Sequence, residues 1–405
     1  MSSTSARRAL IIGGSIGGLF AALALRQQGW DVQVFERTAT PLAGRGAGII
    51  THPQLNRVLE QLGLDPHRDF GVPIQQRITL ARDGRLLCSQ DCPQVATSWD
   101  RMFRLLREAL PDACYTIGAE LTGLEPLPDG IRARFADGRT ADGDLLVGAD
   151  GIRSNVRRLL LGEVPPLYAG YVAWRGLVAE RAMPEPARTQ LFAHFGFCLP
   201  PGEQILGYPI IGDNDELRVG HRRYNFVWYR PADETTALPG LLTDATGHTH
   251  TASIPPPLIR PAVMDAMRNA AAELLAPAFA QVVAATPLPF LQPIYDFESP
   301  RLAFPRAVLL GDAAFVARPH LGAGVTKAAE DAACLATAMA AEPGMDEALA
   351  RYEAERRTAG QNVVRRGRHL GAYLQAGVST PEQQRAAARH QTPEAVMAET
   401  ALLDF

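Results

Sequence analysis

The segment ALIIGGSIGGLFAALALRQQG, residues 9–29, decides the fold. It begins with an apolar run of four residues, continues through a glycine turn, and then repeats apolar residues at the three- and four-residue spacing of a helix. A second apolar run, Val32–Phe35, follows Gly29. A strand, a glycine turn, a helix and a second strand predict a βαβ unit that opens a Rossmann-like α/β domain.

The glycine turn has the residues that a dinucleotide site requires. Gly13 permits the tight turn, and Gly18 permits close packing of the helix on the strand. The helix N-terminus then offers N–H groups and a positive dipole end to a pyrophosphate. Ser15 stands where a middle glycine is usual, and it is small enough for the same approach. Glu36 ends the second strand, where an acid accepts from a ribose hydroxyl, so the segment predicts dinucleotide binding.

Composition narrows the class of protein. The chain has 405 residues, 47% of them hydrophobic, which predicts a globular protein large enough for two domains. Its net charge of -3 gives no electrostatic signature of nucleic-acid binding, and no segment approaches the ~20 uninterrupted apolar residues that span a bilayer. Five cysteines without a CxxC pair favour a reducing, cytoplasmic location and disfavour a metal site. An arginine cluster near the end is interpreted as a solvated helix face: Arg356, Arg357, Arg365, Arg366 and Arg368.

Two further features organise the chain. Asp83-Gly84 and Asp137-Gly138 turns predict hairpins, which we expect to add antiparallel strands to the parallel sheet. From Tyr171 long runs carry aromatic residues at alternate positions and predict an inserted antiparallel sheet.

The first domain is therefore expected to be discontinuous. A helical pattern, Ala262–Val283, leads back to it, and further helices follow from Val325. The predicted fold class is α/β: a Rossmann-like cofactor domain with an inserted antiparallel β-sheet substrate domain and C-terminal helices. We expect the first part at residues 1–168, with a short β-excursion at 72–100, the inserted domain at 169–295, and the second part with the helices at 296–405.

Two later strand ends also carry a glycine beside an acid. These are GADG, residues 148–151, and the GD that opens GDAAFVARPHLGAG, residues 311–324. Asp150 and Asp312 each have a plain interpretation as helix caps. Three such strand ends at one edge of a sheet are harder to explain by capping alone, so a ligand site is the second interpretation.

Together the three motifs resemble the fingerprints of the single-component, FAD-dependent aromatic hydroxylases, the family that includes para-hydroxybenzoate hydroxylase. They cover nearly the whole chain in the same order. Within the family, LYAGYVAWRG (167–176), TSWD (97–100) and ARPHLGAG (317–324) are most similar to the branch of 2,6-dihydroxypyridine 3-hydroxylase and its hydroxypyridine- or purine-hydroxylating relatives.

The resemblance implies a cofactor and a reaction. NADH or NADPH would reduce FAD, O2 would then give a flavin C4a-hydroperoxide, and OH would pass to a small hydroxylated aromatic, an N-heteroaromatic such as a hydroxypyridine. The sequence does not decide between NADH and NADPH, and it leaves a homodimer open. The alternatives are another flavin monooxygenase, such as an epoxidase or a quinone-pathway hydroxylase, or a non-enzymatic FAD-fold binding protein.

The resemblance also assigns residues to the FAD. The pyrophosphate would face Gly13, Ser15 and Gly18. The adenosine ribose would bind Glu36, with Arg37 beside it, and the ribityl chain would bind Asp312. The family often has an arginine or glutamine at the place of Trp99, for which Arg104 is the expected substitute. The other implied cofactor residues are Arg45, Gly48, Asp150, Leu321, Gly322, Ala323 and Gly324.

Catalysis and substrate binding are predicted at the other end of the cofactor. Pro319 would lie where flavin and substrate meet, and His320 is the first catalytic candidate because an imidazole titrates near working pH. A histidine that only bonds backbone is the alternative. Arg175 would meet an anionic substrate or bridge the domains. Two neighbouring strands supply further candidates, of which alternation lets one set face inward: Tyr224, the second catalytic candidate, with Asn225 and His221 on one strand, and Tyr208 and Gln204 on the other.

Overall fold

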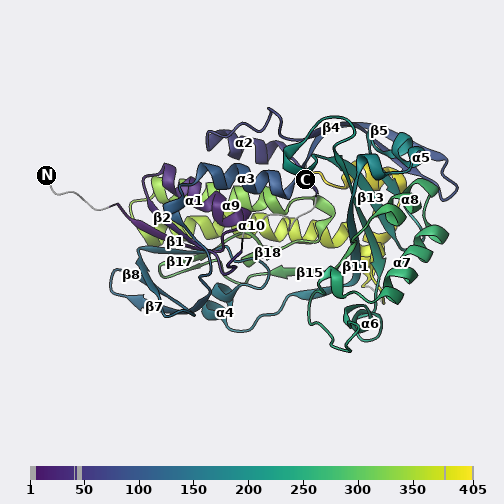
Figure 1. The fold of residues 1–405 in the computed structure, drawn as a ribbon. Coiled ribbons are helices and arrows are strands. Elements are labelled where there is room, and N and C mark those ends of the chain that lie inside the picture. The colour runs from purple at the N-terminus through teal and green to yellow at the C-terminus, as the bar shows by residue number, and fades with distance from the viewer. Residues whose placement is uncertain (1–5, 41, 43–47, 378–379, 404–405) are drawn as a thin grey trace.

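The computed structural model describes residues 6–40, 42, 48–377 and 380–403. Two large sheets lie side by side, a six-stranded one at the left of Figure 1 and a nine-stranded one at the right. A small three-stranded sheet, β7-β8-β9, lies at the lower left. Its strands are β7 (Leu121–Leu127), β8 (Gly130–Phe135) and β9 (Thr140–Gly143).

The six-stranded sheet carries the glycine motifs. Its order is β16-β17-β10-β1-β2-β6, and all its pairings are parallel except that of β16 with β17. Because its helices cover it, β1 and β10 are almost entirely buried and apolar. The strands are β1 (Arg8–Ile12), β2 (Asp31–Phe35), β6 (Tyr115–Thr116), β10 (Leu145–Gly148), β16 (Ala303–Phe304) and β17 (Ala307–Leu309).

Helices from both ends of the chain cover this sheet. The first helix, α1 (Ile16–Gln27), is packed against α9 (Gly324–Ala341), and α10 (Met345–Leu370) packs on α9. Small residues such as Ala21, Ala22 and Ala329 let these helices approach closely. The other helices of this half are α2 (Pro53–Gln61), α3 (Trp99–Ala109) and α4 (Asn155–Leu161).

The nine-stranded sheet has the order β18-β15-β11-β14-β13-β12-β4-β5-β3. All its neighbours pair antiparallel except β12 and β4, which are parallel. The hairpin at Asp83-Gly84 is present as β4 and β5, but it extends this sheet, so the prediction that it adds to the parallel sheet was wrong. The strands are β3 (Gly48–Ile50), β4 (Val72–Leu80), β5 (Leu86–Ser98), β11 (Leu167–Ala179), β12 (His194–Cys198), β13 (Gln204–Ile210), β14 (Arg223–Pro231), β15 (Phe290–Glu298) and β18 (Phe315–Val316).

The two faces of the large sheet have different partners. Along β14, Tyr224, Phe226 and Trp228 face a core that includes Phe279, whereas Val227 and Tyr229 face the opposite side. The helices over the first face are α5 (Glu185–Leu191), α7 (Pro261–Leu274) and α8 (Pro277–Ala285). A fourth, short helix, α6 (Ala237–Leu242), lies between β14 and α7 and adds two leucines to the same core. The single helical pattern predicted over Ala262–Val283 is thus two helices, because Pro277 starts a new one.

Two short helices close the described chain, α11 (Pro381–His390) and α12 (Pro393–Glu399). The arginine cluster of α10 is not uniformly solvated as predicted. Arg357 and Arg365 are exposed, but Arg356 pairs with Asp331 and Arg368 pairs with Asp296, because α10 packs on other elements along its length. Among the described residues, no helix is long and apolar enough to cross a membrane.

Candidate cofactor and substrate cavities

A cavity of about 470 Å³ lies at the carboxyl ends of β1, β2, β10 and β17. This is the edge where parallel α/β sheets bind ligands. All three glycine motifs contribute to it, together with the start of α9. The polar and glycine residues that line it are Gly13, Ser15, Gly17, Glu36, Arg37, Thr38, Asp150, Gly151, Asn155, Gly311, Asp312 and Gly324.

The loop between β1 and α1 has no room for side chains. Gly13 has φ +107°, and a Cβ there would lie 2.4 Å from the carbonyl oxygen of Ala149, which directly follows the neighbouring strand β10. A Cβ on Gly18 would lie 1.8 Å from the carbonyl oxygen of Gly13. The hydroxyl of Ser15 makes no capping bond to α1, although the residue stands at the N-cap. The loop therefore presents backbone N–H groups and a hydroxyl to the cavity.

Glu36 is held at the end of β2 by backbone donors. Its carboxylate accepts hydrogen bonds from the N–H of Gly14 at 2.8 Å and of Thr38 at 2.9 Å. The hydroxyl of Tyr115 donates to the carbonyl of Gly14, and burial, with Glu36 nearby, raises the pKa of Tyr115 to about 12. Glu36 thus lines the cavity in a fixed orientation, with further acceptor capacity. Arg37 is exposed at the same edge.

Asp150 caps α4. Its carboxylate accepts from the Ser154 hydroxyl and from the N–H groups of Asn155 and Val156, at 2.7 and 3.1 Å. Burial raises the pKa of Asp150, and these bonds oppose that rise. The interpretation of Asp150 as a helix cap is therefore correct, and the residue also lines the cavity.

Asp312 stands where the first cavity meets a second one, and it lines both. Its side chain is 50% exposed, and its Oδ1 lies 3.7 Å from the Nζ of Lys327, which is almost fully buried in the first turn of α9. Among the described residues, Nζ of Lys327 has no hydrogen-bond partner. Lys327 was not among the residues predicted from the sequence, where its signal is a lysine in the first turn of a helix rich in small residues.

The second cavity, of about 490 Å³, extends from this junction over the inner face of the large sheet. Trp99, Asp312, Gly324 and Val325 line both cavities, so the two are continuous. Its other walls are mostly aromatic and apolar, as is usual for a small-molecule site. The residues that carry polar groups into its lining are Arg175, Tyr208, Tyr229, Gln292, Tyr295, Asp312, Arg318, His320 and Thr400.

Strand alternation explains which predicted substrate residues reach this cavity. Arg175 and Tyr208 line it, as does Pro319. Tyr224 does not, because it lies on the opposite face of β14 in the core against the helices, where burial raises its pKa well above the usual value. Tyr229, on the inward face, was missed although it follows Val227 by two residues.

Three other candidates lie elsewhere. His221 is exposed in the turn before β14, because the strand begins only at Arg223. Gln204 accepts from the hydroxyl of Tyr373 at 2.8 Å and does not line the cavity. Asn225 is fully buried and accepts from the N–H of Gly48 at 3.2 Å, so it supports β3 at the edge of the cavity.

The remaining cofactor candidates are divided in the same way. Gly322, with φ +61°, lines the second cavity together with Ala323 and Gly324, and α9 begins there without a side-chain cap. Gly48 also lines it. Leu321 packs into a core, and Arg104 pairs with Asp215 in the turn before β14, so neither lines a cavity. Arg45 lies outside the described residues.

His320 is 2% exposed, although it belongs to the cavity lining. Its Nε2 lies 2.7 Å from the hydroxyl of Tyr171, and its ring centroid lies 4.6 Å from that of Tyr229. Burial, followed by the nearby charge of Arg318, lowers the pKa of His320 to about 3. The expectation that this imidazole titrates near working pH therefore fails, because the surroundings exclude the charged form.

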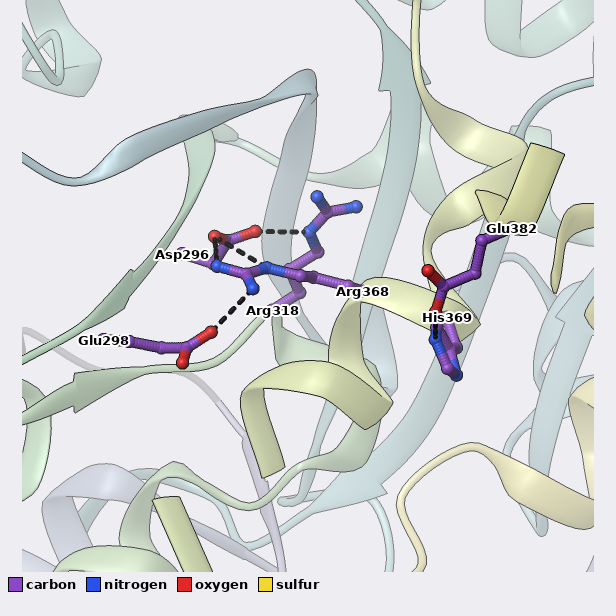
Figure 2. A network of polar contacts seen from close by, with 6 residues as sticks. All are labelled: Asp296, Glu298, Arg318, Arg368, His369 and Glu382. Atoms are coloured by element: carbon purple, nitrogen blue, oxygen red, sulfur yellow. Dashed lines mark hydrogen bonds and ion pairs between the residues drawn. The ribbon is translucent and has the colours of Figure 1, made fainter. Parts of the chain in front are cut away.

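An ion-pair network fixes the loop before His320 (Figure 2). Arg318 donates through Nε to Asp296 at 2.9 Å, and Arg368 of α10 donates to the other oxygen of Asp296 at 2.7 Å and also to Glu298. Arg318 and Asp296 are both almost fully buried. The network ties β15, α10 and the loop together, so Pro319 and His320 have a rigid support.

Comparison with known proteins identifies the family. A family model described as an FAD binding domain matches residues 7–165 and 295–367, and one described as FAD binding domain-like matches residues 168–296. The 2,6-dihydroxypyridine 3-monooxygenase of Paenarthrobacter nicotinovorans is 32% identical over 380 residues, which cover 94% of each chain. The chain belongs to the FAD-dependent aromatic hydroxylases.

Two further comparisons, one with another enzyme and one with a solved structure, support the assignment. The 3-amino-4-hydroxybenzoate 2-monooxygenase of Streptomyces cremeus is 32% identical over 380 residues, covering 90% of this chain and 86% of that one. The solved structure of 2,6-dihydroxypyridine-3-hydroxylase from Arthrobacter nicotinovorans matches with a TM-score of 0.86 at 31% identity, covering 94% of this chain and 96% of that one. The hydroxylase is thus an FAD-dependent monooxygenase, and the predicted fold class and cofactor are confirmed.

The residues present fit FAD. The glycine loop excludes any side chain where a pyrophosphate would lie, Glu36 and Asp312 offer carboxylates along one continuous cleft, and α9 directs an uncapped N-terminus at the junction. NAD(P)H dependence is typical of the family, and the two relatives named above act on a dihydroxypyridine and on an aminohydroxybenzoate.

Proposed function

We propose that this enzyme hydroxylates a small hydroxylated aromatic, an N-heteroaromatic such as a hydroxypyridine, and that it binds the substrate as an anion in the second cavity. The observation that carries the proposal is Arg175. It has no carboxylate partner among the described residues, it lines the cavity, and its charge acts on Tyr208 and Tyr229 of the same lining. The relative that oxidises 2,6-dihydroxypyridine supports the ring class.

The electrostatics of the cavity favour a negative ligand. Arg175 donates to the side-chain oxygen of Gln292 at 2.9 Å, while its Nε is buried without a partner. The other cation of the lining, Arg318, is already paired with Asp296, and Asp312 is the single carboxylate among the described lining residues. A half-buried guanidinium without a carboxylate favours an anionic oxygen of the ligand.

The tyrosine hydroxyls reinforce this preference. Burial raises the pKa of Tyr208 to about 12, although Arg175 opposes that rise, and burial also raises the pKa of Tyr229 and Tyr295. These hydroxyls therefore stay protonated at working pH and can donate hydrogen bonds to a deprotonated substrate oxygen. A deprotonated hydroxyl makes the ring more electron-rich, which is the state that oxygen transfer requires.

When bound, FAD supplies the redox chemistry: it accepts a hydride from NADH or NADPH and activates O2 for transfer of one oxygen atom to the ring. The chain positions the reactants and excludes water. We assign Gly13, Ser15, Gly18, Glu36 and Arg37 to the ADP half, with Arg45 and Asp150 near it. Asp312 would hold the ribityl chain. Pro319, Gly322, Ala323 and Gly324, with Gly48 opposite, would border the ring, and His320 would stay a neutral support.

The finer features of the enzyme are also part of the proposal. Domain limits at residues 168 and 295 are supported by the two family matches, which meet there. A cytoplasmic location is supported by the cysteines, which are all free. A homodimer stays a prediction, which the mass of the purified protein tests by light scattering.

The proposal is tested by a substrate screen with the FAD-loaded protein. Candidates are 2,6-dihydroxypyridine, 6-hydroxynicotinate, 3-amino-4-hydroxybenzoate and urate, and the measurement is NAD(P)H oxidation with a product heavier by one oxygen atom. We expect turnover with a hydroxypyridine. Turnover of the aminohydroxybenzoate alone would replace the N-heteroaromatic class with a carboxylated phenol, and no turnover with any anionic aromatic would refute the proposal.

The role of Arg175 has its own test. Arg175→Met removes a charge-assisted bond worth about 2 kcal/mol, so KM for the substrate should rise about 30-fold while FAD affinity is unchanged. Arg175→Lys should restore part of the loss. The control is Arg188→Met, because Arg188 lies on α5 outside both cavities. An unchanged KM in Arg175→Met would remove the residue from the site.

A further inference from the structure

The segment that follows α12 forms part of the wall of the second cavity. Thr400 and Ala401 line it beside the loop that carries His320. The N–H of Ala401 donates to the carbonyl of His320 at 2.7 Å, and a Cβ on Gly322 would lie 3.4 Å from the Cβ of Ala401. Residues more than 75 positions apart in the chain thus meet at the loop proposed to border the flavin ring.

A fully buried arginine holds this segment from the opposite side. Arg77 of β4 is 0% exposed and donates through Nη1 to the carbonyl oxygens of Met397 and Thr400, the latter at 2.7 Å. It also donates to Gln94 of β5, whose amide donates to the carbonyl of Ala401 at 3.0 Å. The carbonyl groups of Met397, Thr400 and Ala401 are therefore all bonded to side chains of the β4–β5 hairpin.

The partners of Arg77 are unusual for a buried cation. No carboxylate pairs with it among the residues that the structure describes. Arg77 instead donates to backbone carbonyl oxygens at the C-terminal end of α12. The last carbonyl groups of a helix lack partners within the helix, and the helix dipole is negative at that end. Burying a guanidinium without an ion pair is unfavourable unless such groups compensate it. The cation and the segment therefore stabilise each other.

The other side of α12 is anchored as well. Glu399 pairs with Arg366 of α10 at 3.2 Å and with His390 of α11. Arg77 also lies over the ring of Phe195, 5.1 Å from its centroid, and Phe195 lines the same cavity. The segment is thus fixed between the large sheet and α10, with its last residues against the cavity.

We propose that residues 393–401 seal the cavity against water and that Arg77 is the positioning residue that latches them. The proposal rests on the second cavity being the site of hydroxylation. In coupled turnover, NAD(P)H, a proton and O2 give NAD(P)+, with one oxygen atom in the hydroxylated ring and the other in water. When water reaches the site, the same NAD(P)H, proton and O2 give NAD(P)+ and H2O2 instead, and the ring is unchanged.

The test compares the FAD-loaded full-length protein with Arg77→Met and Arg77→Lys. Amide hydrogen exchange at residues 393–401 should be about tenfold faster in Arg77→Met, with a smaller change in Arg77→Lys. Iodide should quench the bound flavin more strongly, and the fraction of NAD(P)H that ends as H2O2 should rise with the hydroxylated product falling in step. Exchange and quenching need no substrate, so they decide the latch even if the proposed substrate class fails.

The matched control is Arg222→Met, which removes a half-buried arginine just before β14 that pairs with Glu180 and is not bonded to the segment. If Arg77→Met does not fold, Gln94→Leu removes the bond to Ala401 and one acceptor of Arg77, but leaves the bonds from Arg77 to Met397 and Thr400. It should show the same local effects at reduced size. Unchanged exchange at 393–401 would overturn the proposal. Equal increases in Arg77→Met and Arg222→Met would also overturn it, because they indicate general loosening.

Discussion

The burial of His320 makes the enzyme lose stability in mild acid. The pKa of His320 falls from 6.5 to about 3, first because it is buried and then because Arg318 is near. Between these two values the unfolded chain binds a proton that the folded chain does not bind, so folding becomes less favourable as the pH falls. Above pH 6.5 the histidine is neutral in both states and costs the folded state nothing. At pH 5 the free energy of unfolding is about 2 kcal/mol smaller than at pH 7 because of this residue.

Replacing the histidine should remove this dependence. His320→Gln keeps a polar side chain of similar length but no group that titrates. Urea unfolding of the FAD-loaded protein, followed by tryptophan fluorescence at pH 7 and pH 5, gives the two free energies of unfolding. The loss between these pH values should be about 2 kcal/mol smaller in the variant than in the parent protein. His221→Gln is the control, because His221 is exposed.

The same reasoning has a kinetic consequence. A histidine with a pKa near 3 is neutral throughout pH 5–9, so the pH profile of kcat/KM should keep its shape in His320→Gln. If the free energy of unfolding fell equally between pH 7 and pH 5 in the variant and the parent protein, the electrostatic argument would be refuted. Loss of one limb of the rate profile in the variant would instead return His320 to a proton-transfer role.

Three further variants test the cavities. Gly18→Ala places a Cβ 1.8 Å from a backbone oxygen, so the purified protein should lack flavin absorbance or be insoluble. Asp312→Asn weakens a carboxylate interaction with the cofactor, and calorimetry should find FAD bound about tenfold more weakly; unchanged affinity would contradict the assignment. Tyr208→Phe removes one hydroxyl donor, so KM should rise about fivefold with kcat and FAD affinity unchanged; a fall in kcat alone would point to a different role.

The parts of the site that depend on local sterics could be predicted from the sequence. Gly13 and Gly18 are required by contacts within one βαβ unit and its neighbouring strand. Glu36 follows directly from the end of β2. The fold class followed from the same local patterns, because each strand and helix near the motifs is amphipathic or buried in a way that its own residues specify.

The parts that depend on tertiary contacts could not be predicted. Alternation along β14 places Tyr224 and Tyr229 on opposite faces of the sheet, but the sequence does not show which face the helices cover. The β4–β5 hairpin has a clear turn, yet its sheet is decided by pairing with β12, more than 100 residues later. The pKa of His320 depends first on burial, which involves Tyr171 and Tyr229 from strands far away in the sequence.

The parallel pairing of β12 with β4 has a practical consequence. The two halves of the enzyme share one continuous sheet, since β3, β4 and β5 come from the part of the chain that precedes the inserted segment. A fragment cut at residues 168–296 would lack these strands and would leave β12 as an uncovered edge with the sequence HFGFC. Unprotected apolar edges pair with other chains, so we expect this fragment to aggregate, whereas a fragment that also carries residues 48–98 would keep its edge covered.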